Sequence, residues 1–270
     1  MSAPITGYAE LQAVSNFSFL RGAAHPEELV DTAAALGHHA LAIADHNTLA
    51  GVVRGHVAAR AHDLRYVVAS RLDLVDGPSV LALPQDRAGY GRLSRLLSLG
   101  KRRATKGNCH LTHDDLVALG GGHHLLVLPP ARPDAVFAGH LDRFSALFRG
   151  QCWLAGHLLY GGRDRAWLAH LAELARRHRA PLVATGAVHY HVPERRPLQD
   201  VLTCVRHHCT IDDAGYRLAA NAERYLKPPA EMARLFRDYP AAIARTVEIA
   251  DACRFSLDEL RYEYPDELTA

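Results

Sequence analysis

Asp45 and His46 place a carboxylate beside an imidazole directly after a short apolar run at residues 40–44. Such a run is typical of a strand buried on both faces. A helical pattern begins near Thr48, which is predicted as the helix N-cap. Barrels and open parallel sheets keep their chemistry at the carboxyl ends of strands, so the pair is a candidate site. In the alternative interpretation Asp45 caps the next helix and His46 only covers the strand end.

The composition sets the outer limits. The chain has 270 residues, of which 49% are hydrophobic and 22% are charged, enough for one large α/β domain or two small ones. A net charge of +2 gives no global signal for a polyanion partner. The five Cys form no Cys-x-x-Cys pair and no disulfide framework. Without a signal peptide at the start or an apolar run long enough to span a membrane, we expect a cytoplasmic protein.

The 18 His residues include three adjacent pairs, at positions 38–39, 123–124 and 207–208. Neighbouring residues on a helix or a strand do not share a face, so adjacent pairs are poor chelators. We expect most of these His residues to lie on the surface.

Apolar patterning predicts about seven strands that alternate with helices. The predicted strands are 7–14, 40–44, 66–74, 80–83, 124–128, 152–157 and 182–185. The predicted helices are 26–36, 48–61, 87–99, 112–119, 133–149 with a break near Gly139, 163–178 and 197–206, followed by a helix-rich end over 219–260. Asp76 and Gly77 mark a hairpin turn. The alternation favours parallel strands with crossover helices, in a barrel or an open doubly wound sheet.

Four basic residues gather in a predicted loop at 100–108: Lys101, Arg102, Arg103 and Lys106. They are a weak candidate for nucleic-acid contact. A solvated loop is the interpretation we favour, because the overall charge is close to neutral.

The order of the motifs resembles the polymerase and histidinol phosphatase (PHP) domain, and more narrowly the amino-terminal PHP domain of bacterial C-family, alpha-type replicative polymerases. The resemblance is carried by 12–22 (QAVSNFSFLRG), 42–47 (AIADHN), 184–190 (ATGAVHY) and 198–202 (LQDVL). The string at 15–22 followed by 25–29 (HPEEL) is most similar to the error-prone, damage-inducible branch.

The resemblance implies a distorted (β/α)7 TIM-like barrel, the PHP fold, over residues 1–215, with a helix-rich C-terminal segment over 216–270. It also implies up to three metal ions at the carboxyl ends of the strands, held by His, Asp, Glu and sometimes Cys. In active members that cluster hydrolyses phosphoesters, including as a proofreading exonuclease, because clustered ions polarise a phosphoryl oxygen and activate water.

This chain departs from that ligand pattern at most positions. The positions without the family's ligand are Gln12, Val14, Arg71, Ser79 and Ala187, and the remaining candidate metal ligands are Asp45, His46, His189 and His157. A divalent ion needs about four N or O donors, so these could hold one weak Zn, Mn or Mg ion at most. We therefore expect no cofactor and no catalytic residue.

The parent activity implied by the resemblance is DNA-directed DNA synthesis in translesion, damage-induced mutagenesis. The family's palm and catalytic aspartates lie beyond the PHP domain, so we expect no polymerase activity from this chain alone, whether it is a domain fragment or a free-standing product. An inert scaffold is the favoured function. Its partners would be the remainder of the polymerase chain or other translesion-synthesis proteins, with DNA reached through the parent polymerase and no membrane. The alternatives are a residual metal-dependent phosphoesterase or 3′-5′ exonuclease, and a DNA-contacting module.

Two expectations concern the former metal cavity. Val14 should be buried among apolar side chains where the family has a His ligand. Arg71 should reach into the cavity and pair with Asp45, directly or through one water, and so replace the metal's positive charge. In the alternative, Arg71 points to solvent.

Overall fold

Residues 7–260, which the computed structural model describes, contain seven strands in one sheet whose order follows the chain. The strands are β1 (Ala9–Ala13), β2 (Ala40–His46), β3 (Arg65–Leu72), β4 (Val80–Pro84), β5 (His123–Val127), β6 (Cys152–Gly156) and β7 (Leu182–Ala184). Strand β4 is antiparallel to β3 and β5, and the other neighbours are parallel. The predicted hairpin after β3 is thus confirmed, and β4 is the antiparallel exception in a sheet that is otherwise parallel, as the alternation of strands and helices favours.

The sheet curls so that its first and last strands meet. Beyond β7, Val188 forms a parallel bridge with Ala13, and Val14 N donates to Val188 O at 2.9 Å. This contact brings the carboxyl ends of β1 and β7 together at one rim of the curled sheet, which we call the mouth of the barrel. The α/β fold predicted from the sequence, a distorted seven-stranded barrel, is confirmed.

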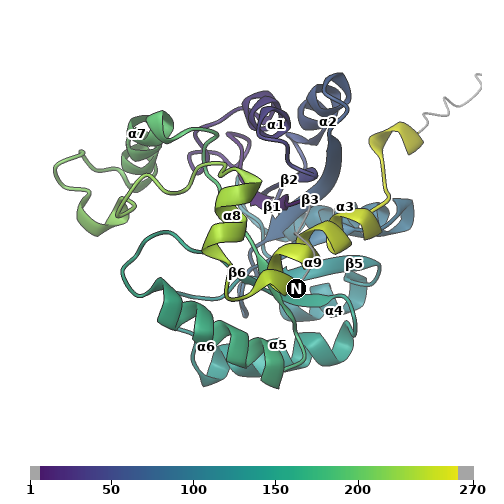
Figure 1. Cartoon of the computed structure of the whole chain (residues 1–270). Coiled ribbons are helices and arrows are strands. Elements are labelled where there is room, and N and C mark those ends of the chain that lie inside the picture. The colour runs from purple at the N-terminus through teal and green to yellow at the C-terminus, as the bar shows by residue number, and fades with distance from the viewer. Residues whose placement is uncertain (1–6, 261–270) are drawn as a thin grey trace, which may run out of the picture.

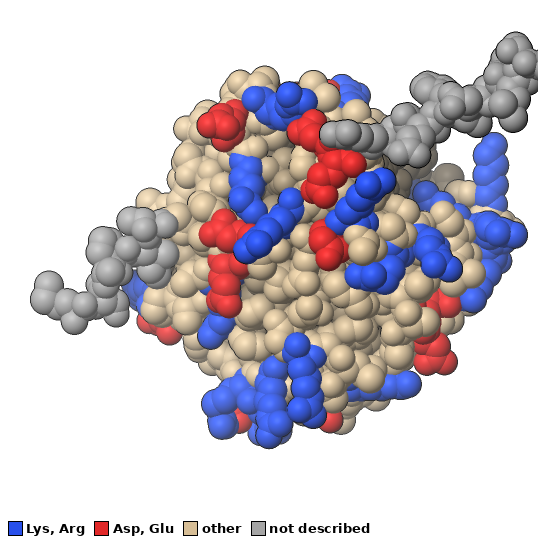
Figure 2. All heavy atoms as spheres, turned by 90° about the vertical axis from the view of Figure 1, so that its right-hand side faces the viewer, with Lys and Arg blue, Asp and Glu red and all other residues tan. Residues whose placement is uncertain are grey.

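Helices cover the outside of the sheet. They are α1 (Pro26–Ala35), α2 (Val52–Ala61), α3 (Arg87–Arg103), α4 (His113–Leu119), α5 (Ala135–Leu147), α6 (Asp164–Arg177), α7 (Arg196–His207), α8 (Pro229–Leu235) and α9 (Pro240–Ala252). Figure 1 shows α1 and α2 over one side of the sheet, α5 and α6 over the opposite side, and α7 with its following loop projecting away from the barrel. Figure 2 shows acidic and basic side chains mixed over the upper half of one face, and mainly basic side chains along its lower edge.

The two faces of each strand bury different side chains. Along β2, Ala42 and Ala44 belong to the apolar cluster inside the barrel, with Leu81, Leu83 and Trp153 among its larger members. Leu41 and Ile43 instead pack with the residues of α1, in the layer between sheet and helices. Because successive strand residues point to opposite faces, this alternation fixes where each residue at the strand end must point.

The C-terminal helices are part of the same packing. Helix α9 packs against β1 and β7, and the hydroxyl of Thr246 accepts a hydrogen bond from Ala9 N at 3.0 Å. The predicted division at residue 215 stays a prediction, and its outer ends, 1–6 and 261–270, lie outside the described residues. Within residues 7–260, no helix is long and apolar enough to cross a membrane.

Several predicted helix boundaries need correction. Helix α2 begins at Val52 after Gly51, so Thr48 is not its N-cap. Helix α5 runs through Gly139 without a break. Helix α3 continues to Arg103, because the Lys and Arg side chains of its last turn are good helix formers and interact favourably with the helix dipole.

Most of the 18 His residues are not buried, as expected, but four are: His38, His113, His123 and His124. Three of them have polar partners that a neutral ring can use. His38 Nε2 lies 3.1 Å from Lys227 O, His123 Nδ1 lies 2.9 Å from Gly120 O, and Trp153 Nε1 donates to His124 Nδ1 at 3.1 Å. Burial lowers the pKa of His38 and of His124 from 6.5 to about 4.

We predict that His38 makes folding weaker in mild acid. Its pKa is about 4 in the folded chain and about 6.5 when unfolded, so the unfolded state binds more protons between these values and stability falls as the pH drops through that window. Between about pH 7.5 and pH 5, His38 should account for a loss on the order of 1–2 kcal/mol in the free energy of unfolding.

Denaturant titrations of the wild type and of His38→Gln measure this contribution, because the Gln amide can still donate to Lys227 O. The variant should lose less stability than the wild type over the same pH interval. Equal losses in the two proteins would show that His38 is not held neutral by burial.

Candidate functional site

Asp45 lies near the carboxyl end of β2 and is 3% exposed. Its two carboxylate oxygens accept three hydrogen bonds, from Ser15 N at 2.8 Å, Ser15 Oγ at 2.7 Å and Ser18 Oγ at 2.6 Å. Burial raises the pKa of the carboxyl group, and the hydrogen bonds from the two Ser residues oppose that rise. Asp45 therefore ties the loop that follows β1 to the end of β2.

Arg71 does not pair with Asp45, and the predicted direct ion pair is wrong. The β2–β3 register places Arg71 opposite His46 and Ser70 opposite Asp45. Side chains in register on parallel strands share a face, so Arg71 points with His46 toward the inside of the barrel. Asp45 lies two residues after Ile43 and four after Leu41 on the same strand, so its side chain points to the same face as theirs, toward the helix layer.

The partner of Arg71 is Asp73, which sequence reasoning missed. Arg71 Nε donates to Asp73 Oδ1 at 2.7 Å, and Ser79 Oγ donates to the same oxygen at 2.6 Å. His46 Nδ1 lies 2.8 Å from Asp73 Oδ2. Burial alone would raise the pKa of Asp73, but the His46 hydrogen bond and the Arg71 charge hold it well below its usual range. The sequence signal that could have indicated this pairing is an acidic residue, Asp73, directly after the strand that carries Arg71.

His46 and His189 are held in their neutral forms at this mouth. Burial lowers the pKa of His46, and the hydrogen bond to Asp73 offsets this only in part. Burial also lowers the pKa of His189 well below its usual value, and the positive charges of Arg224 and Arg71 lower it further. Positive charges therefore lie near both rings, and His46 also has the carboxylate of Asp73 as its partner.

Most of the positions without the family's ligand line one cavity of about 650 Å³ at the mouth. It is lined by Gln12, Arg71, Ser79, Ala187, His157 and Arg224, among others. Burial lowers the pKa of His157 to about 4, helped by the nearby charge of Arg224. Val14, with 4% exposure, is buried as expected. The sequence thus predicted a shared location for these positions but not the guanidinium of Arg224.

Glu10 on β1 is a second buried carboxylate that sequence reasoning missed, at 1% exposure. It accepts hydrogen bonds from Tyr8 Oη at 2.7 Å, Gln12 N at 2.7 Å and Gly186 N at 2.8 Å. Burial raises its pKa against these hydrogen bonds. It ties the segment after β7 to β1, much as Asp45 ties the loop after β1 to β2.

The four basic candidates for nucleic-acid contact separate into two places, because the predicted loop is helical through Arg103. Lys101 and Lys106 line a groove of about 1050 Å³ next to His46. Arg102 and Arg103 line a different hollow, on another side of α3, and Arg103 Nη1 donates to Asp115 at 2.6 Å. Arg103 is therefore engaged in an ion pair.

Within the described part of the chain, no group of three or more His, Cys, Asp or Glu side chains is placed to hold a metal ion. Asp45, His46, His157 and His189 do not form such a group. Asp45 faces the helix layer, whereas His46 and His157 line separate hollows.

Comparison with known proteins identifies the family. A family model described as the PHP domain matches residues 10–175, and the chain belongs to this family. It is 53% identical over 261 residues to an error-prone DNA polymerase of Caulobacter vibrioides, covering 96% of this chain and 24% of that protein. It is 50% identical over 267 residues to error-prone DNA polymerase 1 of Agrobacterium fabrum, covering 99% of this chain and 24% of that protein. The chain thus spans about a quarter of the length of these relatives.

A solved structure shares the fold at low sequence identity. It is an amidohydrolase from Chromobacterium violaceum with bound sulfate and no metal. Its TM-score is 0.54 at 16% identity, over 68% of this chain and 88% of that one. The likeness supports the barrel architecture.

We predict that Arg71 is energetically coupled to Asp73 and not to Asp45. A double-mutant cycle with Arg71→Ala and Asp73→Ala should give a coupling energy of about 0.5–1 kcal/mol, since the pair is partly exposed. The matched cycle with Arg71→Ala and Asp45→Asn should give a coupling near zero. Urea denaturation supplies both values, and a larger coupling with Asp45 would reverse the assignment.

Proposed function

We propose that this chain is a non-catalytic PHP domain that acts as a structural scaffold for the remainder of a longer chain of the error-prone DNA polymerase type. The relatives named as error-prone DNA polymerases support it, because the match covers nearly all of this chain and only about a quarter of theirs. DNA synthesis would belong to the whole protein, with this domain packed against the rest.

The donor chemistry at the mouth supports the non-catalytic part of the proposal. The side chains of Val14 and Ala187 carry no donor atom, and Arg71 brings a fixed positive charge to a position where the resemblance to the family implies a metal ligand. At about 4 Å and an effective dielectric constant of ~20, one unit charge repels another by roughly 4 kcal/mol. Asp45 already has both oxygens hydrogen-bonded on the other face of the sheet. This donor set does not fit a multi-metal cluster.

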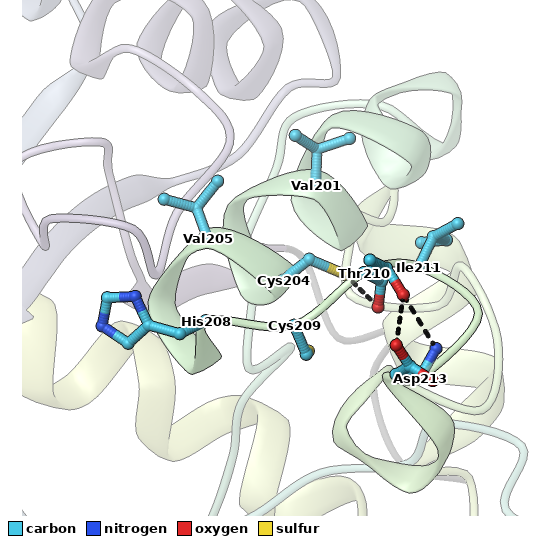
Figure 3. Close-up of a pocket in the computed structure, with 8 residues that line it drawn as sticks. All are labelled: Val201, Cys204, Val205, His208, Cys209, Thr210, Ile211 and Asp213. Atoms are coloured by element: carbon cyan, nitrogen blue, oxygen red, sulfur yellow. Dashed lines mark hydrogen bonds between the residues drawn. The ribbon is translucent and has the colours of Figure 1, made fainter.

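The observation that carries the scaffold role is an uncovered apolar face on α7. Leu198, Val201 and Val205 repeat at helical spacing and are 40%, 54% and 52% exposed. Figure 3 shows Val201 and Val205 projecting from the same side of α7, while Cys204 points toward Thr210. Together with Ile211 they line a largely apolar hollow of about 580 Å³. Contiguous apolar surface of this kind is typical of a protein contact.

The occupant we assign to this face is the remainder of the longer chain. Helix α7 projects away from the barrel, so a further domain could reach it without displacing any strand or helix described here (Figure 1). Another exposed valine pair, Val53 and Val57 on α2, is 60% and 61% exposed but lines none of the hollows described above. Val201 and Val205 thus line a hollow and Val53 and Val57 do not, although the two pairs match in residue type and are similarly exposed.

We predict that Val201→Glu prevents association with the remainder of the polymerase, because a carboxylate cannot be buried there without a partner. The remainder of the Caulobacter vibrioides relative, supplied as a separate chain, should bind the wild type and lose at least about tenfold in affinity for the variant, as about 1.4 kcal/mol would give. Calorimetric titration measures both.

Val57→Glu is the matched control, with the same substitution at a similarly exposed helical valine. It should bind as the wild type does. If Val201→Glu binds unchanged, or if both variants lose affinity equally, the α7 face is not the contact and the scaffold proposal fails.

A further inference from the structure

The groove beside His46 gathers positive charge from separate parts of the chain. Its lining includes Arg21 from the loop after β1, Lys101 from the last turn of α3, Lys106 beyond that helix, and Arg206 from α7. These residues are far apart in sequence, so the fold and not a local basic run creates the concentration of charge. It stands out against a chain whose net charge is only +2.

These four cations have no anionic partner among the residues that the structure describes. Among residues 7–260, no carboxylate lies within 4.0 Å of the charged groups of Arg21, Lys101, Lys106 or Arg206. Asp73 also lines the groove, but its two oxygens are already bonded within the mouth. Burial lowers the pKa of Arg206, and the like charge of Arg21 lowers it further. Clustered cations of this kind are stabilised by an external anion.

An aromatic side chain stands beside the charges. Phe19 lines the groove and is 81% exposed, so it contributes nothing to the core. The next residue, Leu20, has φ 60°, a left-handed conformation that is costly for a leucine. Arg206 Nη1 donates to Leu20 O at 3.2 Å and helps to hold this turn. Strained backbone of this kind is concentrated at functional sites such as ligand clamps.

We infer that this groove binds single-stranded nucleic acid, with Arg21, Lys101, Lys106 and Arg206 contacting successive phosphates and Phe19 stacking on a base. Non-sequence-specific single-strand sites combine a basic groove with aromatic platforms in this way. A duplex would keep its bases stacked on one another and leave Phe19 unused. An acidic peptide would satisfy the charges but not the exposed ring.

Fluorescence anisotropy with a labelled oligothymidylate of about 15 nucleotides tests the inference. The wild type should bind, with log Kd rising linearly with log salt between about 50 and 200 mM NaCl. Lys101→Ala should weaken binding and lower the salt slope by about 0.7, the value for one lost phosphate contact on a single strand. Arg102→Ala, its neighbour on the other side of α3, should leave both affinity and slope unchanged.

Phe19→Ala should weaken oligonucleotide binding by about fivefold or more without changing the salt slope, whereas Phe19→Trp should retain it. Circular dichroism checks that each variant is folded. Equal effects of Lys101→Ala and Arg102→Ala, indifference to Phe19→Ala, or duplex and acidic-peptide probes binding as tightly as the single strand would each overturn the inference. Val205 and His208 line both this groove and the α7 hollow, but Phe19, Lys101 and Arg102 lie outside the α7 hollow, so a loss of oligonucleotide binding in their variants does not decide the scaffold proposal.

Discussion

The structure of the mouth depends on the buried carboxylate of Asp45. An ionised group taken out of water is costly unless hydrogen bonds replace its hydration. Ser15 and Ser18 supply these bonds, and they can do so only when the loop after β1 folds back over the end of β2. That fold brings Gly22 so close to Ser15 O that a Cβ would lie 2.5 Å from it. The position of Phe19 and Arg21 at the groove follows from this constraint.

Two further buried or partly buried carboxylates at the mouth are also satisfied by hydrogen bonds from the chain itself. Glu10 is satisfied by Tyr8, Gln12 and Gly186, and Asp73 is satisfied by the network of His46, Arg71 and Ser79. Glu10, Asp45 and Asp73 are thus balanced by hydroxyl, backbone, imidazole or guanidinium groups of the chain itself. In the hollow that holds Arg71 and Arg224, Asp76 and Asp134 also line the wall, whereas in the groove beside His46 the cations Arg21, Lys101, Lys106 and Arg206 outnumber the single carboxylate of Asp73. The composition of that groove favours an anion over a divalent cation.

Sequence patterning predicted the order of the strands and most helices, because burial imposes a period that the residues display directly. It also placed Gln12, Arg71, Ser79 and Ala187 at one location, through the family's motif order. The Arg71–Asp45 pair failed because which face a strand residue presents depends on register with the next strand, and one residue of offset reverses it. The presence of Arg224 and Arg206 at the mouth could not be predicted from the sequence for a related reason, since only the curled sheet brings them there.

The central claim is that protein donors, and not metal ions, complete the mouth of the barrel. Elemental analysis of the purified chain, after equilibration with excess Zn²⁺ and Mn²⁺ and removal of free ions, tests it most directly. The account predicts less than one ion per chain and a melting temperature that a chelator does not change, because a ligand that binds the native state would raise it. Two or three ions per chain, with a clear loss of thermal stability on chelation, would contradict it.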